Sequence, residues 1–141
     1  MMRWLKIGSA GLAVALVVVQ FFPVARVNPT EREQPTAPVE VQAIFQRACY
    51  DCHSNETQWP WYSYVAPMSF LIARDVTEGR RELNFSLWSQ FNERRKARKL
   101  KEIVEQVEKG KMPQWYYVAL HPDAKLSPAD RDLIIKWARQ P

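Results

Sequence analysis

The sequence predicts an all-α fold, with a small helical domain preceded by an N-terminal hydrophobic helix. Apolar residues recur at helical spacing in several separate stretches of the chain. No alternating strand pattern of useful length occurs, and the 4 glycines among 141 residues give little punctuation for strands and turns. Hydrophobic residues make up 47% of the chain, which excludes a disordered protein.

Residues 1–25 are predicted to form a signal-anchor or transmembrane segment. Basic residues precede an uncharged, largely apolar run, residues 7–22, which as a helix spans about 24 Å against a bilayer core of about 30 Å. With Leu5 and Val24 added, and with Lys6 reaching to the interface, the run is just long enough to cross. Pro23 is badly placed for cleavage after Ala25, so an uncleaved anchor is favoured, and a cleaved signal peptide stays the alternative.

Residues 26–38 hold three prolines and charges of both signs, which predicts an extended, semi-rigid linker. The domain proper is expected to be residues 39–141. Its first helix begins near Val39 and runs directly into a pair of cysteines. The apolar positions of this helix fall at i, i+3, i+4, i+7, i+8 and i+11: Val41, Ile44, Phe45, Ala48, Cys49 and Cys52.

Three elements are expected in the middle of the domain. "MSFLIARDV" predicts a short helix that ends near Gly79, and "LNFSLW" is extended or turn-like. Apolar residues between Leu100 and Val107 mark a helix of about 20 residues, which stops at Gly110.

The last part of the domain is a loop or broken helix followed by a final helix. "KMPQWYYVALHPDAK" has no sustained period and is predicted to be the irregular part. Ser127, Pro128 and Asp130 supply an N-cap, a proline at the first helical position and an acid at the third. The final helix is expected to bury three side chains: Leu133, Ile134 and Trp137.

The positive charge of the chain is concentrated in one run. Residues 94–101, "RRKARKLK", carry six basic side chains and no acid. Residues 38–141 hold 16 Lys and Arg against 13 Asp and Glu, a net of +3, so the same region without the run would carry −3. This is one patch on one helix, and no nucleic-acid partner is expected. The patch is either a solvated helix face or a docking surface for an acidic protein.

The stretch "CYDCH", residues 49–53, contains both cysteines and one of the two histidines of the chain. Cys49-x-x-Cys52-His53 has the spacing of c-type haem attachment. Two thiols three residues apart on one helical turn can bond the two vinyl groups on one edge of a porphyrin. The adjacent imidazole then lies under the iron. The motif predicts one haem c, attached covalently through both cysteines.

Other uses of the motif fit less well. A thioredoxin-like thiol pair would follow a strand, whereas here a helix precedes it. A zinc site with His121 is disfavoured because Cys52 and His53 are adjacent, and zinc ligand pairs usually leave a gap. A disulfide would leave His53 without a role.

Residues 39–139 resemble the small haem-binding domain family of bacterial exported proteins, distantly similar to class I cytochromes c. The matching stretches are "CYDCHSNETQWPWYSYVAP", "DVTEGRRELNFSLW", "GKMPQWYY" and "LHPDAKLSPADRDLIIKWA". The resemblance implies a cytochrome c-like helical fold, haem on Cys49 and Cys52, and His53 as an axial ligand. With the N-terminal segment, it predicts a single-pass protein of the bacterial inner membrane whose haem domain lies in the periplasm.

Met112 is the predicted sixth ligand of the iron. It lies in "GKMP", where Gly110 ends a helix and Pro113 keeps Met112 out of helical geometry. His121 is the main rival, Met68 a weaker one, and an open position is the remaining alternative.

Trp59 and Trp61, just after the motif, are predicted to line the haem. The alternative is that they are ordinary aromatic residues of the hydrophobic core. These residues together predict a monohaem c-type cytochrome and favour a non-enzymatic carrier of single electrons over an enzyme. Its expected partners are redox proteins, the haem-attachment machinery and the inner membrane. The alternatives are a haem-based sensor or a peroxidase-like protein with an open or displaceable sixth ligand.

Overall fold

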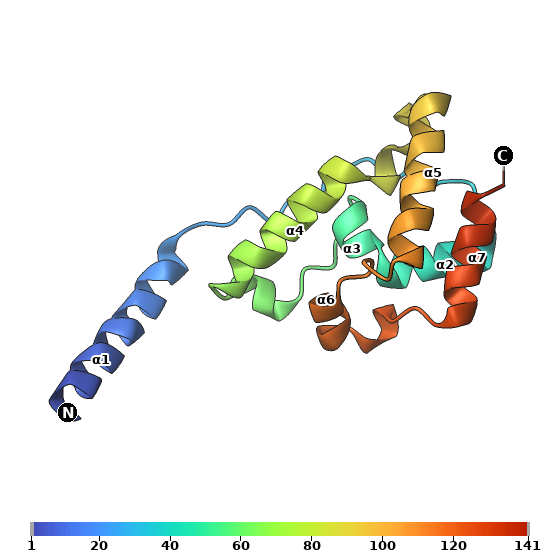
Figure 1. The fold of residues 1–141 in the computed structure, drawn as a ribbon. Helices are drawn as coiled ribbons and strands as arrows, with labels where there is room; N and C mark the ends of the chain where they lie inside the picture. Colours follow the sequence, from blue (N-terminus) through green and yellow to red (C-terminus); the bar gives the residue numbers. More distant parts are fainter. Residues whose placement is uncertain (1, 141) are drawn as a thin grey trace.

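The computed structural model describes residues 2–140, and the side chains of residues 8–140. All regular structure in this part of the chain is helical, which confirms the all-α prediction (Figure 1). The α-helices are α1 (Met2–Val18), α2 (Val39–Ala48), α3 (Tyr50–His53), α4 (Met68–Glu82), α5 (Glu93–Glu108), α6 (Trp115–Leu120) and α7 (Pro128–Ala138). Short 3₁₀ helices are η1 (Val19–Phe21), η2 (Trp61–Tyr64), η3 (Phe85–Gln90) and η4 (Pro122–Ala124).

Helix α1 projects away from the other helices (Figure 1). It has 17 residues, about 26 Å at the rise of an α-helix, and the chain tightens into η1 where it ends. In the described part of the chain, no helix is both long and apolar enough to cross a bilayer. The prediction of a single-pass protein of the bacterial inner membrane, with residues 1–25 as its span, is therefore wrong.

Residues 26–38 are extended, and they lie along the domain. The Arg26 guanidinium donates to the Ser63 carbonyl at 3.0 Å, and the Asn28 amide donates to the Thr57 carbonyl at 2.8 Å. Near the other end of the segment, the Trp137 indole N–H donates to the Thr36 carbonyl at 3.0 Å. The segment is thus fastened to the loop that follows the CYDCH motif and to the last helix.

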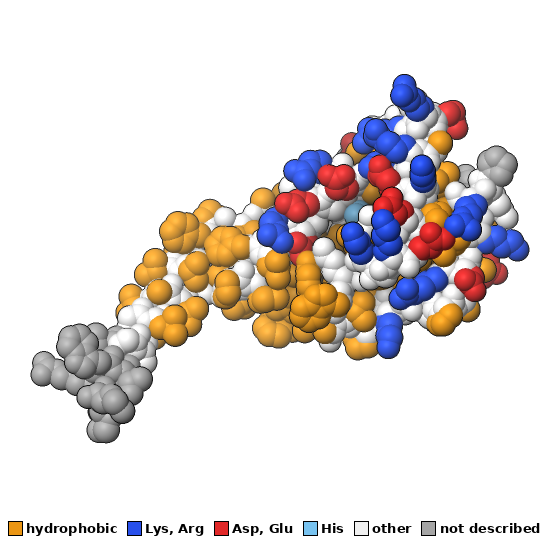
Figure 2. Space-filling view, in the orientation of Figure 1, with side chains coloured by type: hydrophobic (Ala, Val, Ile, Leu, Met, Phe, Trp, Pro, Cys, Tyr) orange, Lys and Arg blue, Asp and Glu red, His pale blue; other side chains and the backbone are white. Residues whose placement is uncertain are grey.

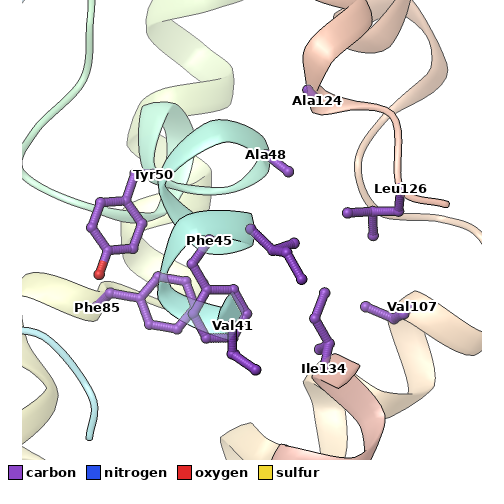
Figure 3. Close-up of a cluster of buried hydrophobic side chains, with 10 residues drawn as sticks. Val41, Phe45, Ala48, Tyr50, Phe85, Val107, Ala124, Leu126 and Ile134 are labelled. Carbon is purple, nitrogen blue, oxygen red and sulfur yellow. The ribbon is translucent and has the colours of Figure 1, made fainter. Parts of the chain in front are cut away.

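The core lies where α2 meets α5, α7 and η3 (Figures 1 and 3). The Phe45 ring stacks on Phe85, with ring centroids 4.8 Å apart, and meets the edge of Trp137 at 5.2 Å. Ile134 of α7 is 1% exposed, as the sequence predicts, but Leu133 is 40% exposed, so its predicted burial is wrong. The apolar stripe of α7 faces α2 and α5, and Leu133 lies at its margin.

Local stop and start signals act where the sequence predicts them. Gly110 ends α5 with φ 62°, a left-handed conformation that glycine adopts without strain. Ser127 and Asp130 form a reciprocal capping box at the start of α7, with Pro128 at its first position. Helix α4 differs from expectation, because it continues past Gly79 to Glu82.

Candidate functional site

The CYDCH motif forms a single helical turn that is separated from α2 by a kink. Cys49 departs from helical geometry, with φ −129° and ψ −35°. Its carbonyl then accepts the backbone N–H groups of Cys52 and His53 at 3.2 and 2.9 Å, which closes the turn α3. Both thiols are free and half-buried.

The two thiols are held in their neutral form. Burial, and then the charge of Cys52, raises the pKa of Cys49 to about 12. Burial, followed by the nearby Asp51 and Asp75, raises the pKa of Cys52 to about 12. A catalytic thiol pair of the thioredoxin type needs a depressed pKa. These shifts run in the opposite direction, which argues against the redox-pair alternative.

His53 is oriented by two backbone carbonyls, one inside α4 and one at the residue that follows its end. Its Nδ1 lies 3.0 Å from the Gly79 oxygen and 3.0 Å from the Leu83 oxygen. A carbonyl only accepts, so Nδ1 carries the proton and Nε2 keeps its lone pair. Burial lowers the pKa of His53, which favours the neutral ring. A neutral imidazole with one nitrogen fixed by a carbonyl is the arrangement that metal-binding histidines use.

Gly79 lets α4 approach the motif closely. A Cβ atom at this position would lie 2.4 Å from the Cys52 carbonyl oxygen and 3.1 Å from the Cys52 Cβ. Any side chain here would push α4 away from α3. The close contact is also what brings the Gly79 carbonyl to the His53 ring. An isolated glycine inside a helical pattern was the sequence signal for this contact.

Three adjoining hollows surround the motif. The first, of about 180 Å³, is lined by Cys49, Cys52 and His53 and also by Met112. The second, of about 370 Å³, shares Cys49, His53 and Met112 and extends to the core. The third, of about 260 Å³, shares Cys52 with the first. These sizes fall in the range of cofactor pockets, about 300–1,000 Å³, when the hollows are taken together.

Met112 is brought to the motif from the far end of α5. It is half-buried in the turn between Gly110 and Pro113. Its side chain lines both of the hollows that His53 lines. Two thiols, a neutral imidazole and a thioether therefore meet around one space. This donor set fits haem iron and the porphyrin edge.

The two predicted tryptophans lie elsewhere. Trp61 is 77% exposed, and its ring meets Tyr62 edge-on with centroids 5.8 Å apart. Trp59 is half-buried, and its indole N–H is buried without a hydrogen-bond partner. Neither tryptophan lines any of the three hollows.

The rival sixth ligands line only the third hollow. His121 has both ring nitrogens in contact with partners: Nε2 lies 3.1 Å from the Tyr62 hydroxyl, and Nδ1 lies 3.2 Å from the Tyr117 carbonyl. Met68 lines the same third hollow and neither of the other two. Met112 is thus the only one of the three that shares a hollow with His53.

Several residues of the site carry no obvious sequence signal. Tyr117 and Asp51 form a hydrogen bond at the edge of the first hollow, with the hydroxyl donating at 2.7 Å. Lys99, counted in the sequence as part of a charged patch, is 6% exposed and lines the second hollow. Such contacts depend on which helices meet, and no local pattern encodes them.

An all-helical domain with a CxxCH turn, a fixed neutral imidazole and a thioether beside it defines a haem protein. Residues 14–140 match the family described as "Haem-binding domain", and the chain belongs to this family. The match confirms the predicted resemblance to a haem-binding domain family and supports haem as the cofactor. No match was found among curated proteins or among solved structures.

Proposed function

We propose that this chain is a monohaem c-type cytochrome that carries single electrons. Cys49 and Cys52 would hold the haem covalently, and His53, through Nε2, and Met112 would be the ligands of its iron. The observation that carries the proposal is that Cys49, His53 and Met112 line the same two hollows although Met112 is 59 positions from His53.

Covalent attachment of haem starts from reduced thiols, and both cysteines of the chain are free thiols. Each cysteine sulfur bonds one carbon of a vinyl group, and its hydrogen goes to the neighbouring carbon, so the addition needs neither oxidant nor reductant. The haem-attachment machinery is the partner expected to carry out this addition.

Haem, when bound, supplies an iron that takes up and releases one electron. The role of His53 is to present Nε2, because the Gly79 and Leu83 carbonyls hold its Nδ1–H. The role of Met112 is to occupy the sixth position with a soft ligand, which raises the reduction potential and excludes other ligands. A closed six-coordinate iron favours electron transfer over a sensor or a peroxidase.

The run 94–101 is a weaker docking surface than the sequence indicates. Lys96 pairs with Glu93, while Arg98 and Lys99 pair with Glu102 of the same helix. Figure 2 shows acidic and basic side chains interspersed over α5. Surface pairs of this kind contribute little to stability, but they reduce the field that an acidic redox partner would meet.

The test is Met112→Ala in the haem-loaded full chain, with Met68→Ala as the matched control. We expect Met112→Ala to lose the thioether-to-iron charge-transfer absorption of the ferric protein, to lower its reduction potential and to let imidazole bind the iron. Met68→Ala should behave like the unaltered protein. An unchanged spectrum and potential in Met112→Ala would refute Met112 as the ligand and favour the open-site alternatives.

A further inference from the structure

The segment that follows Met112 is fastened to the motif by tyrosine hydroxyls. Helix α6 has six residues, and none of its side chains is fully buried. The Tyr117 hydroxyl donates to Asp51 Oδ2 at 2.7 Å, and the Tyr116 hydroxyl donates to Asp75 Oδ2 at 2.9 Å. Apolar packing therefore holds α6 in place only in part, and these two hydrogen bonds add to that packing.

The two bonds reach two different helices across the same space. Asp51 belongs to α3, inside the CYDCH turn, and Asp75 belongs to α4. Both aspartates line the 180 Å³ hollow together with Met112 and Tyr117. The bonds thus connect the segment that carries Met112 to the two helices that position His53.

The stronger of the two links is built on fixed groups. The other oxygen of Asp51 accepts the backbone N–H of Gln58 at 2.9 Å, so the carboxylate cannot rotate freely. The Tyr117 ring is half-buried and packs against the His121 ring, with centroids 4.2 Å apart and the planes tilted by 31°. A hydrogen bond to a charged group between two restrained side chains is among the stronger ones in proteins.

We propose that the Tyr117–Asp51 and Tyr116–Asp75 hydrogen bonds form a clamp that holds the Met112 segment in place beside His53. The four side chains are positioning residues that act through Met112. The inference rests on the proposed function, because the clamp would determine how readily another ligand displaces Met112 from the iron.

The expected size follows from the bond that is lost. Removing a hydrogen bond to the partly buried Asp51 carboxylate shifts the balance between the held and the released segment about tenfold. An outside ligand binds only when Met112 is released, so its apparent affinity rises by the same factor while release remains rare.

The experiment measures imidazole affinity for the ferric haem in the haem-loaded full chain. Tyr117→Phe should raise the affinity about tenfold, and Tyr116→Phe should raise it less. Tyr64→Phe is the matched control, because Tyr64 is 60% exposed and its hydroxyl takes no part in the clamp. Combining Tyr117→Phe with Asp51→Asn should add little to either change alone, since both remove one bond.

A second readout does not depend on the iron ligand. Amide hydrogen exchange of residues 112–120 should be faster in Tyr117→Phe than in the unaltered chain, and unchanged in Tyr64→Phe. Unaltered imidazole affinity and unaltered exchange in Tyr117→Phe would overturn the clamp. Tyr117→Phe keeps the ring and leaves Asp51 bonded to Gln58, so it tests the proposal even where Asp51→Asn does not fold.

The clamp and the proposed function fail in distinguishable ways. If Met112→Ala binds imidazole no better than the unaltered chain, the assignment of Met112 as ligand is refuted, and with it the role of the clamp at the iron. If Met112→Ala binds imidazole tightly but Tyr117→Phe does not, Met112 remains the ligand and the clamp alone is refuted.

Discussion

Gly79→Ala should destabilise the domain, although alanine is the better helix former. Gly79 lies inside α4, and a Cβ there would be 2.4 Å from the Cys52 carbonyl oxygen. Side-chain carbons in proteins do not approach closer than 3.0 Å, so α4 and α3 must separate by about 0.6 Å. That displacement also moves the Gly79 carbonyl away from His53 Nδ1.

The energy terms have opposite signs and can be compared. Alanine gains about 0.8–1 kcal/mol in helix propensity over glycine. Forcing the added carbon into a packed contact costs about 1–3 kcal/mol. Weakening the His53 hydrogen bond costs about 0.5–1.5 kcal/mol. The net expectation is a loss of roughly 0.5–3.5 kcal/mol.

Urea unfolding of the haem-loaded full chain measures this loss, with Gly11→Ala as the control. Gly11 is also helical, and a Cβ there would meet nothing within 4 Å, so propensity alone acts and no loss is expected. Gly79→Ala should also reduce the haem attached per chain, because the CYDCH turn is displaced. A Gly79→Ala chain as stable as the unaltered one, with full haem content, would refute the close contact of α3 and α4.

Two further predictions concern charged groups that hold the domain together. Arg80 donates four hydrogen bonds, two to residues 27–28 and two to residues 54–57. Arg80→Ala should therefore cost about 2–4 kcal/mol of unfolding free energy, whereas Arg81→Ala should cost under about 0.5 kcal/mol. Equal losses of the two variants in urea unfolding would contradict this expectation. Burial raises the pKa of Asp130, but hydrogen bonds from Ser127 and the ion pair with Arg47 outweigh it and leave the pKa below the usual 3.8. A carboxyl group whose pKa is depressed in the folded state stabilises the fold at pH values above its unfolded-state pKa. This stabilisation is lost as the pH falls through the folded-state pKa. Asp130→Asn should therefore cost about 1 kcal/mol at pH 7 and progressively less below pH 3.8, and a loss independent of pH would refute the role of the charge.

Local chemistry was predictable from the sequence where neighbouring residues decide it. The end of α5 at Gly110 and the capped start of α7 at Ser127 follow from the conformations that these residues prefer. The grouping of Met112 with His53 around the same hollows was also predictable, because Gly110 and Pro113 place Met112 on a constrained loop outside the helices.

The remaining features depend on which helices meet. The sequence placed a helix end near Gly79, but α4 continues past it, because contact with α3 explains this glycine. Lys99 was counted with its charged neighbours, yet it is buried at the hollow. Trp61 was expected beside the cofactor, yet it is exposed, because η2 turns its ring outward. Residues 7–22 are apolar enough to suggest a span, but α1 ends at Val18.

The most direct test of the central claim is whether haem is bonded to the two cysteines. The full chain, produced in a host that attaches haem c, is denatured in alkaline pyridine, and its visible spectrum is recorded before and after separation from free haem. We expect a c-type spectrum that stays with the polypeptide, and its loss in the Cys49→Ser, Cys52→Ser double variant. Haem that separates from the denatured chain, or a chain that acquires none, would contradict it.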